Sequence, residues 1–254
     1  MLSSVCAPGL EDVAAAAPNH PKIFQLYVRG DANFVDDHVK RAMDNGFIAF
    51  AFTVDLDYYS KRERDLAKRY VTTGRRLAGY NEDHQMRFSW DDVKRVQDKF
   101  DIPIILKGIA TAEDAQVCVE NGIDVVYVSN HGGRQLDHGR GGLDVLPEVV
   151  SAVDGKAKVM LDGGIMRGAD LVKAMALGAD AVGMGRFQGM AIAAGGARAL
   201  VRALEILEDE VRAALGMLGV TSYAELDASH LHPNAIEVRE PHVLSCFPLI
   251  EEGY

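Results

Sequence analysis

The stretch richest in reactive side chains is SNHGGRQLDHG at residues 129–139, where histidines, an arginine and amides surround a glycine pair. The imidazole of His131 can take or give a proton near neutral pH. The guanidinium of Arg134 can grip a carboxylate through two hydrogen bonds. The apolar run DVVYV, which reads as a buried strand, lies directly upstream. Because leaving so many polar groups unpaired beside a buried strand is costly, the sequence predicts a functional site here.

Other ionisable residues follow the other predicted strands. Asp55 can orient the histidine and stabilise its cationic form, as a carboxylate does in a catalytic triad. Arg62 is a second candidate for binding a carboxylate, and Tyr27 can hydrogen-bond a hydroxyl or carbonyl group. Lys107 offers a point positive charge suited to an anionic or electron-rich centre. A single aspartate or lysine at the end of a strand is more often part of a structural ion pair. A functional site therefore requires that these side chains meet at one edge of the predicted sheet.

Two glycine-containing segments favour a phosphate site. Asp162, Gly163 and Gly164 follow one predicted strand, and Gly185 and Arg186 follow the next. Glycine backbone and an arginine after the last strands of a β/α barrel often hold a phosphate. The string GMGRFQG does not have the GxGxxG spacing, so it predicts no Rossmann dinucleotide site.

An internal repeat predicts the elements that position these groups. Residues 107–130 and 163–186 share glycines and aspartates that recur 56 residues later, as Gly122 and Gly178 do. Each copy reads as a strand, a turn, an amphipathic helix ended by that glycine, and a second apolar strand. Thr111 is expected to cap the first of these helices. Two β-α units in this length match the spacing of a (β/α)₈ barrel.

The predicted strands are fewer than the eight of a closed barrel. They are expected at 23–28, 48–53, 103–107, 124–129, 158–162 and 180–185, and residues 1–3 read as the tail of another. The segment from Gly189 onward reads as helix and then as a tail with prolines, so the deficit is expected at the N-terminus. The predicted fold class is an α/β barrel of the TIM type, N-terminally incomplete, with strands 3–8 and the tail of strand 2. We expect a single domain over 1–254, with the barrel at 1–230 and a tail at 231–254.

Composition narrows the class of protein. The chain has 254 residues, of which 48% are hydrophobic and 25% charged, so it can bury a core. A formal net charge of −10 weighs against nucleic-acid binding. No membrane span and no signal peptide are recognised, so a cytoplasmic protein is expected. No metal site is expected either, because the HLH string at 230–232 lacks further ligands nearby.

The string SNHGGRQLD, with KGI before it and LDGG and GMGR after it, resembles the FMN-dependent α-hydroxy acid oxidases and dehydrogenases, such as glycolate oxidase, lactate oxidase and mandelate dehydrogenase. The similarity runs from Ser3 to about residue 230 and includes FQLYV, FTVD, RERDL and FSWDDV. The resemblance implies FMN as the cofactor and oxidation of an (S)-2-hydroxy acid to a 2-keto acid. It also implies oxygen, a quinone or a cytochrome as the electron acceptor, and a homotetramer.

The resemblance implies a role for each matching residue. His131 would be the base that takes the hydroxyl proton, with Asp55 hydrogen-bonded to it. Arg62 and Arg134 would bind the substrate carboxylate, and Tyr27 would contact the substrate. The residues implied to bind FMN are Ser3, Gln25, Thr53, Lys107, Ser129, Asp162, Gly163, Gly164, Gly185 and Arg186. Among these, Lys107 would stabilise the reduced ring beside N1 and the C2 carbonyl.

The sequence departs from the family pattern in several places. The family's first strand, first helix and most of its second strand are absent, and the loop at 56–88 is shorter than usual. Val5 stands where an aromatic residue is expected, and Met166 stands where an arginine contacts the phosphate. Two alternatives stay open. One is a truncated, inactive remnant that binds FMN weakly or not at all, and the other is a different FMN barrel such as type 2 isopentenyl diphosphate isomerase, which has no need for SNHGGRQ.

Overall fold

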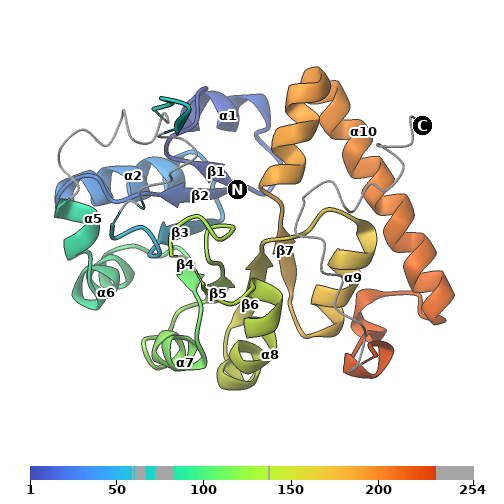
Figure 1. The fold of residues 1–254 in the computed structure, drawn as a ribbon. Coiled ribbons are helices and arrows are strands. Elements are labelled where there is room, and N and C mark those ends of the chain that lie inside the picture. The colour runs from blue at the N-terminus through green and yellow to red at the C-terminus, as the bar shows by residue number, and fades with distance from the viewer. Residues whose placement is uncertain (59, 61–66, 72–82, 137, 233–254) are drawn as a thin grey trace. The chain divides into compact units, whose positions relative to one another are not determined.

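The computed structural model describes residues 1–58, 60, 67–71, 83–136 and 138–232 of the chain. The chain divides into two compact units, Met1–Met160 and Leu161–Tyr254. The strands of the first unit follow one another across the sheet in the order of the sequence (Figure 1). The strands of the chain are β1 (Leu2–Ser3), β2 (Ile23–Leu26), β3 (Ala49–Thr53), β4 (Ile104–Ile109), β5 (Val125–Val128), β6 (Lys158–Asp162) and β7 (Ala181–Gly183).

Helices alternate with these strands in the described residues. They are α1 (Leu10–Ala16), α2 (Ala32–Asp44), α5 (Asp83–Arg87), α6 (Trp90–Lys99), α7 (Ala112–Glu120), α8 (Gly142–Val153), α9 (Gly168–Ala176) and α10 (Arg186–Leu218). Two short 3₁₀ helices follow, η1 (Tyr223–Glu225) and η2 (Ala228–His230). All six strands predicted from the sequence are present, and the expected extra strand at residues 1–3 is β1.

The strand pairs from β1 to β5 are all parallel, which brings their carboxyl ends to one edge. Ser3 of β1 lies opposite Gln25 of β2, and Thr53 of β3 lies opposite Lys107 of β4. All five residues of β3 are buried, as expected for a strand covered on both faces. The register therefore places the predicted site residues of neighbouring strands at matching heights.

The internal repeat is confirmed in the helices. α7 and α9 are both 9 residues long, and their bounds differ by the repeat length read from the sequence. The side chain of Thr111 caps α7 by accepting from the backbone N–H of Asp114 at 3.1 Å. Gly122 and Gly178 follow the two helices with φ of 66° and 98°, a conformation that glycine adopts at little cost.

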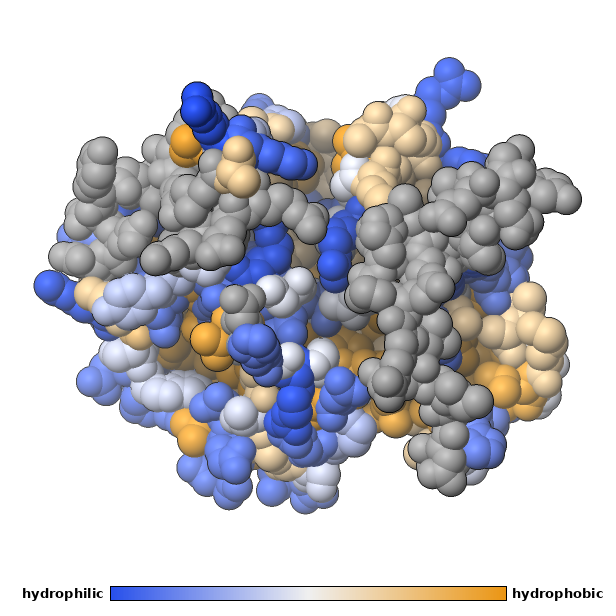
Figure 2. Space-filling view, viewed as in Figure 1, coloured by the Kyte–Doolittle hydropathy of each residue, from blue (hydrophilic) through white to orange (hydrophobic). Residues whose placement is uncertain are grey.

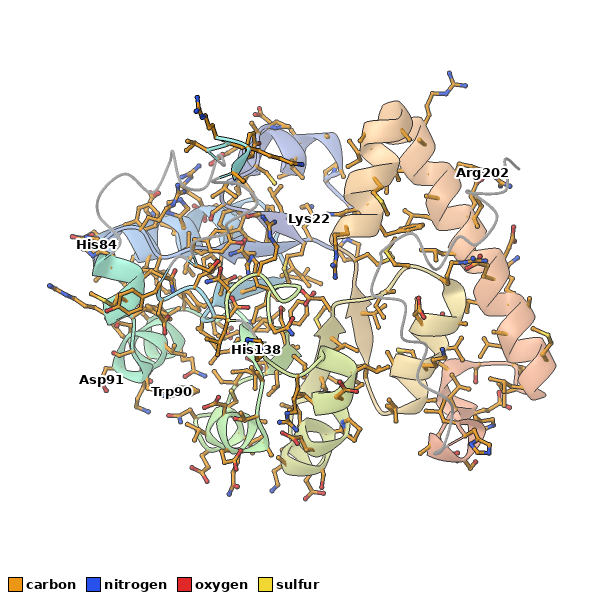
Figure 3. The ribbon with its side chains drawn as sticks, viewed as in Figure 1. Lys22, His84, Trp90, Asp91, His138 and Arg202 are labelled. Carbon is orange, nitrogen blue, oxygen red and sulfur yellow. The ribbon has the colours of Figure 1, made fainter. Side chains whose placement is uncertain are left out.

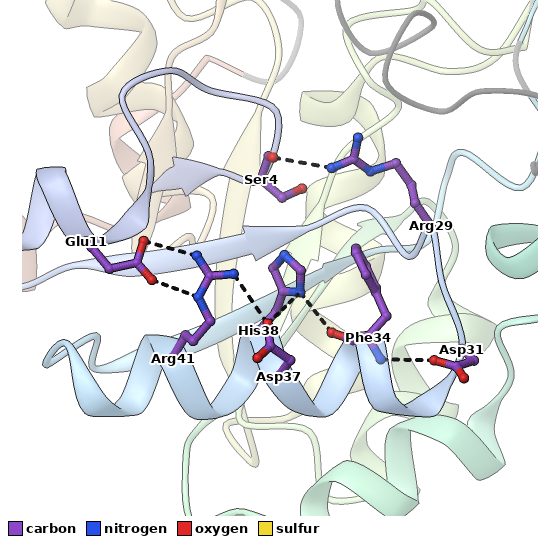
Figure 4. Close-up of polar contacts among 8 residues, drawn as sticks. All are labelled: Ser4, Glu11, Arg29, Asp31, Phe34, Asp37, His38 and Arg41. Atoms are coloured by element: carbon purple, nitrogen blue, oxygen red, sulfur yellow. Dashed lines mark hydrogen bonds and ion pairs between the residues drawn. The ribbon is translucent and has the colours of Figure 1, made fainter.

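Ion pairs tie the helices of the first unit together. Arg41 of α2 donates from Nε and Nη2 to the carboxylate of Glu11, in α1, at 2.7 and 3.0 Å (Figure 4). Asp36 of α2 accepts from both Arg95 and Lys99 of α6. Burial alone would raise the pKa of Asp36, but hydrogen bonds from these two cations lower it below its ordinary value. Helix α2 is thus bound on two sides by charged partners.

Lys22 is a buried lysine directly before β2 (Figure 3). Its Nζ donates to the backbone carbonyls of Ala17, Pro18 and His20 at 2.9, 3.2 and 3.1 Å. Carbonyl groups past the end of a helix have no partner within that helix, and a lysine ammonium satisfies them well. Lys22 therefore anchors the turn between α1 and β2.

The second unit is organised around α9 and α10. Val172 of α9 packs against Val211 and Leu215 of α10. The backbone of α10 is non-helical at Gly195 and Gly196, so two helical pieces follow one another there. Apolar side chains lie at the surface over α10 (Figure 2), and exposed ones include Ile192, Val201 and Met217. No helix in the described part of the chain is long and apolar enough to cross a membrane.

Candidate active site

His131 and Asp55 meet at the carboxyl ends of β5 and β3. The imidazole Nδ1 of His131 lies 3.1 Å from Oδ1 of Asp55, and the two side chains are only 19% and 10% exposed. The second carboxylate oxygen of Asp55, Oδ2, is buried and has no hydrogen-bond partner among the described residues. A carboxylate at Nδ1 favours the tautomer with its proton on that nitrogen, which leaves Nε2 able to accept a proton. The predicted pairing of Asp55 with His131 is present.

The backbone around His131 has an uncommon conformation. His131 has φ of 57°, in the left-handed region that few non-glycine residues occupy, and Gly133 has φ of 71°. Asn130 holds this turn, because its Oδ1 accepts from the Gly133 N–H at 3.0 Å and its Nδ2 donates to the Arg140 carbonyl at 2.9 Å. The N–H of His131 itself donates to Oγ of Ser129 at 3.2 Å. Asn130 was not among the residues predicted for the site, although an asparagine two residues before a glycine pair is a turn signal.

Buried polar side chains form a row at the ends of β2 to β5. Nε2 of Gln25 donates to Oγ1 of Thr53 at 2.8 Å, and Nζ of Lys107 donates to Oγ of Ser129 at 2.7 Å. Gln25, Thr53 and Ser129 are 4%, 0% and 1% exposed. Lys107 Nζ also lies 5.3 Å from the centre of the Tyr127 ring. Amide, hydroxyl and ammonium groups in a row fit a ring that carries carbonyl and N–H groups, such as the isoalloxazine of FMN.

Tyr27 follows β2 and lies close to the histidine. The centres of the Tyr27 and His131 rings are 6.3 Å apart. The backbone N–H of Tyr27 donates to Oγ of Ser4 at 3.1 Å, and Ser4 was not among the predicted site residues. Ser3, the predicted flavin contact on β1, accepts at Oγ from the N–H of Val5 at 3.4 Å. The structure thus brings Tyr27, Asp55 and His131 together at one edge.

Gly108 allows β4 to approach Asp55 closely. Gly108 has φ of +122°, and a Cβ at this position would lie 2.7 Å from Asp55 Cβ and 2.8 Å from the Asp55 nitrogen. The pairing of β4 with β5 shifts register between Lys107 and Ile109, so Gly108 lies in an irregularity of the ladder. Gly108 is the glycine of the KGI string, and it was not among the residues predicted for the site.

The loops after β3 and β5 also touch. Oγ of Ser60 donates to the Arg134 carbonyl at 2.5 Å, and Nε2 of Gln135 donates to the Tyr58 carbonyl at 2.9 Å. Arg134 is exposed on this loop. Arg62, the predicted partner of Arg134 in carboxylate binding, lies outside the described residues, so its role stays a prediction.

The second unit carries the predicted phosphate-binding backbone. Asp162 ends β6, and Gly163 and Gly164 follow with φ of 103° and 77°. Gly185 is the N-cap of α10, and Arg186 is its first residue. A Cβ at any of these three glycines would meet nothing within 4 Å, so open space borders this backbone. Exposed glycine N–H groups, a helix N-terminus and an arginine fit a phosphate group, such as that of FMN.

Met166 stands where the family resemblance implies an arginine that contacts the phosphate. Met166 is 6% exposed. Arg167 does not stand in for that arginine, because its Nε and Nη2 donate to Oε1 of Glu210 in α10 at 2.8 and 2.6 Å. Glu210 also accepts from the N–H of Gly168 at 2.7 Å. Because Arg167 is engaged with Glu210, Arg186 remains the candidate for binding the phosphate among the arginines predicted for the site in this unit.

The chain is similar in sequence and in structure to proteins named as oxidases of 2-hydroxy acids. It is 37% identical to an L-lactate oxidase of Nostoc sp., over 91% of this chain and 70% of that protein. It is 37% identical to glycolate oxidase 3 of Arabidopsis thaliana, over 96% of this chain and 71% of that protein. A crystal structure of mandelate oxidase with benzoyl-formic acid matches with a TM-score of 0.81 and 39% identity, over 88% of this chain and 66% of that one.

These similarities confirm the predicted fold class, the TIM-type β/α barrel with part of its strands. The chain spans just under two thirds of the length of the mandelate oxidase that it matches. The model of the family described as FMN-dependent dehydrogenase matches residues 1–233. The chain belongs to the FMN-dependent dehydrogenase family, whose cofactor is FMN.

Proposed function

We propose that this chain oxidises an (S)-2-hydroxy acid to a 2-keto acid with FMN as its cofactor. The proposal rests on the contact of 3.1 Å between Nδ1 of His131 and Oδ1 of Asp55, two groups suited to take a proton and to stabilise the resulting cation. Relatives named as oxidases of L-lactate and glycolate support this substrate class. Such acids share a hydroxyl group next to a carboxylate.

His131 acts as the base in this proposal. Asp55 holds the proton on Nδ1, so Nε2 accepts the proton of the substrate hydroxyl. As the imidazole becomes cationic, the charge of Asp55 stabilises it, and the low exposure of the pair strengthens this interaction. Proton removal by a positioned base contributes about 10²–10⁴-fold to a rate.

The substrate is held by its carboxylate and its hydroxyl. The guanidinium groups of Arg134 and Arg62 bind the carboxylate in two-point contacts, which fixes the direction of the α-carbon. Tyr27, whose ring lies next to that of His131, hydrogen-bonds the substrate. This arrangement presents the hydroxyl to Nε2 of His131.

FMN, when bound, supplies the acceptor for the two electrons and the hydrogen of the substrate α-carbon. Gln25, Thr53 and Ser129, with Ser3, would hold the polar edge of the ring. Lys107 would add a positive charge where the reduced ring becomes electron-rich. The residues that would hold the ribityl phosphate are Asp162, Gly163, Gly164, Gly185 and Arg186. Oxygen, a quinone or a cytochrome would then accept the electrons.

The test is an anaerobic titration of the FMN-loaded chain with (S)-lactate, glycolate and (S)-mandelate. The proposal predicts that at least one acid bleaches the visible flavin band, and that (R)-lactate and (R)-mandelate do not. A chain that binds FMN but is bleached by none of these acids would contradict the proposal. A chain that takes up no FMN would favour the inactive remnant.

A further inference from the structure

We propose that Gln85 is a positioning residue for the pair formed by His131 and Asp55. Gln85 lies in the short helix α5, next to His84, which is labelled in Figure 3. Gln85 is buried and is only 8% exposed. A buried primary amide is costly unless both its oxygen and its nitrogen find partners. This inference rests on the proposed function, because it concerns the geometry of the proposed base.

The amide of Gln85 joins the ends of two strands. Its Oε1 accepts from the backbone N–H of Val28 at 2.7 Å, and its Nε2 donates to the backbone carbonyl of Thr53 at 3.0 Å. Val28 comes directly after Tyr27, and Thr53 comes two residues before Asp55. One side chain therefore spans the backbone segments that carry two of the proposed active-site residues.

The segment that leads to Asp55 is held from three directions. Oγ1 of Thr53 accepts from Gln25 of β2, while its carbonyl accepts from Gln85 of α5. The N–H of Val54 donates to the carbonyl of Lys107, in β4, at 2.8 Å. The bond from Gln85 is the one that comes from outside the sheet. Without it, the end of β3 keeps its ladder contacts but loses its tie to the segment after Tyr27.

The consequence for catalysis is geometric. Asp55 Oδ1 must stay within hydrogen-bond distance of His131 Nδ1 to fix the tautomer, and Tyr27 must stay beside the same ring. Displacements of about 1 Å at a reacting group can cost on the order of 10²-fold in rate. Gln85 touches neither the histidine nor a substrate position that we assign, so it acts only through Asp55 and Tyr27.

The test compares Gln85→Met with Gln97→Met. Methionine matches the shape of glutamine but forms neither hydrogen bond. Gln97 is the control because its Nε2 also donates to backbone carbonyls, those of Asn121 and Gly122, at 3.2 and 3.1 Å in the same unit. With FMN saturating, we expect Gln85→Met to lower the rate constant of flavin reduction about tenfold or more, and Gln97→Met to leave it within about twofold. Equal rates in the two variants would overturn the inference.

Gln85→Glu gives a second readout that a purely structural role would not produce. A carboxylate can still accept from the Val28 N–H, but only the protonated acid can donate to the Thr53 carbonyl. The rate of Gln85→Glu, divided by the wild-type rate at the same pH, should therefore rise as the pH falls from 7 towards 5. A ratio that is constant over this range would argue against the positioning role.

A third readout does not depend on activity. The ¹⁵N chemical shifts of the His131 ring, recorded at one pH, report the tautomer and the hydrogen bond to Asp55. We expect these shifts to change in Gln85→Met and to stay as in the wild type in Gln97→Met. If no acid reduces the wild type, the proposed function fails, and unchanged shifts in Gln85→Met would overturn the positioning inference separately.

Discussion

Gly108 of β4 and Asp55, which follows β3, lie so close that only glycine fits at position 108. A Cβ on Gly108 would come within 2.7 Å of the Asp55 Cβ. Asp55 in turn contacts His131 at 3.1 Å, so the position of the proposed base depends on the backbone of β4 as well as on β3 and β5. The contact makes Gly108 a point at which the histidine can be disturbed without changing an ionisable group.

Gly108→Ala is expected to destabilise the chain and to slow flavin reduction. The new methyl group must push Asp55 away from His131, and φ of +122° is strained for alanine. We expect a loss of about 1–3 kcal/mol in the free energy of unfolding, measured in urea. Gly46→Ala is the matched control, since Gly46 also has a positive φ of +70° but a Cβ there meets nothing within 4 Å. If both variants reduce flavin at the same rate, the contact with Asp55 has no catalytic importance.

Arg134→Lys is expected to weaken substrate binding by more than tenfold. Lysine keeps the charge but cannot form the two parallel hydrogen bonds of a guanidinium with a carboxylate. The measurement is the substrate concentration that gives half-maximal anaerobic reduction. Arg140→Lys controls for a change in the same loop, because Arg140 is engaged with Glu148 at 2.6 Å. An unchanged half-saturation in Arg134→Lys would rule out the carboxylate clamp.

Gly164→Ala is expected to weaken FMN binding about tenfold, which corresponds to about 1.4 kcal/mol. The added methyl group would occupy the open space beside the Gly164 backbone, where the phosphate is proposed to bind. Gly196→Ala is the control, because Gly196 has a similar φ of +63° with equally open surroundings. Riboflavin, which lacks the phosphate, should bind Gly164→Ala and wild type alike in a fluorescence titration. If Gly164→Ala binds FMN and riboflavin more weakly by the same factor, the effect does not come from the phosphate, and Gly164 is not part of the phosphate site.

The ion pair of Glu210 with Arg167 predicts a pH dependence of stability. Burial alone would raise the pKa of Glu210, but hydrogen bonds from Arg167 and from the Gly168 N–H lower it below 4.5. A carboxyl group with a lowered pKa in the folded state stabilises that state above its ordinary pKa. This contribution is lost as the pH falls through the lowered value. The free energy of unfolding of the wild type should therefore exceed that of Glu210→Gln at pH 7, and the difference should shrink below about pH 4.5.

The control for this prediction is Glu205→Gln, since Glu205 is 54% exposed and its partner Arg202 is 65% exposed. Glu205→Gln should change the free energy of unfolding by little at any pH. A difference between wild type and Glu210→Gln that does not vary between pH 7 and pH 3 would contradict the assignment.

Much of the fold could be predicted because the strands and the repeat leave simple patterns. Apolar runs marked β2 to β7, and the glycines at 122 and 178 marked the ends of α7 and α9. The pairing of His131 with Asp55 could be predicted because parallel strands bring their carboxyl ends together. For His131 and Asp55, the residue type and the position after a predicted strand were enough to predict that they pair.

The supporting residues could not be predicted in the same way. Gln85 and Asn130 act through backbone groups, and a glutamine or asparagine that bonds a distant carbonyl has no characteristic spacing in the sequence. The role of Gly108 depends on how closely β4 passes the end of β3. Such contacts follow from packing, which a single sequence does not display.

The most direct test of the proposed chemistry is anaerobic reduction of the FMN-loaded chain by its best 2-hydroxy acid, with wild type and His131→Ala compared in one stopped-flow experiment. We predict that His131→Ala binds FMN as tightly as the wild type, because the histidine is not among the proposed cofactor ligands. We predict that its flavin is reduced at least about 100-fold more slowly, because the base is gone. Reduction of His131→Ala at the wild-type rate would show that another group takes the proton and would contradict the assignment.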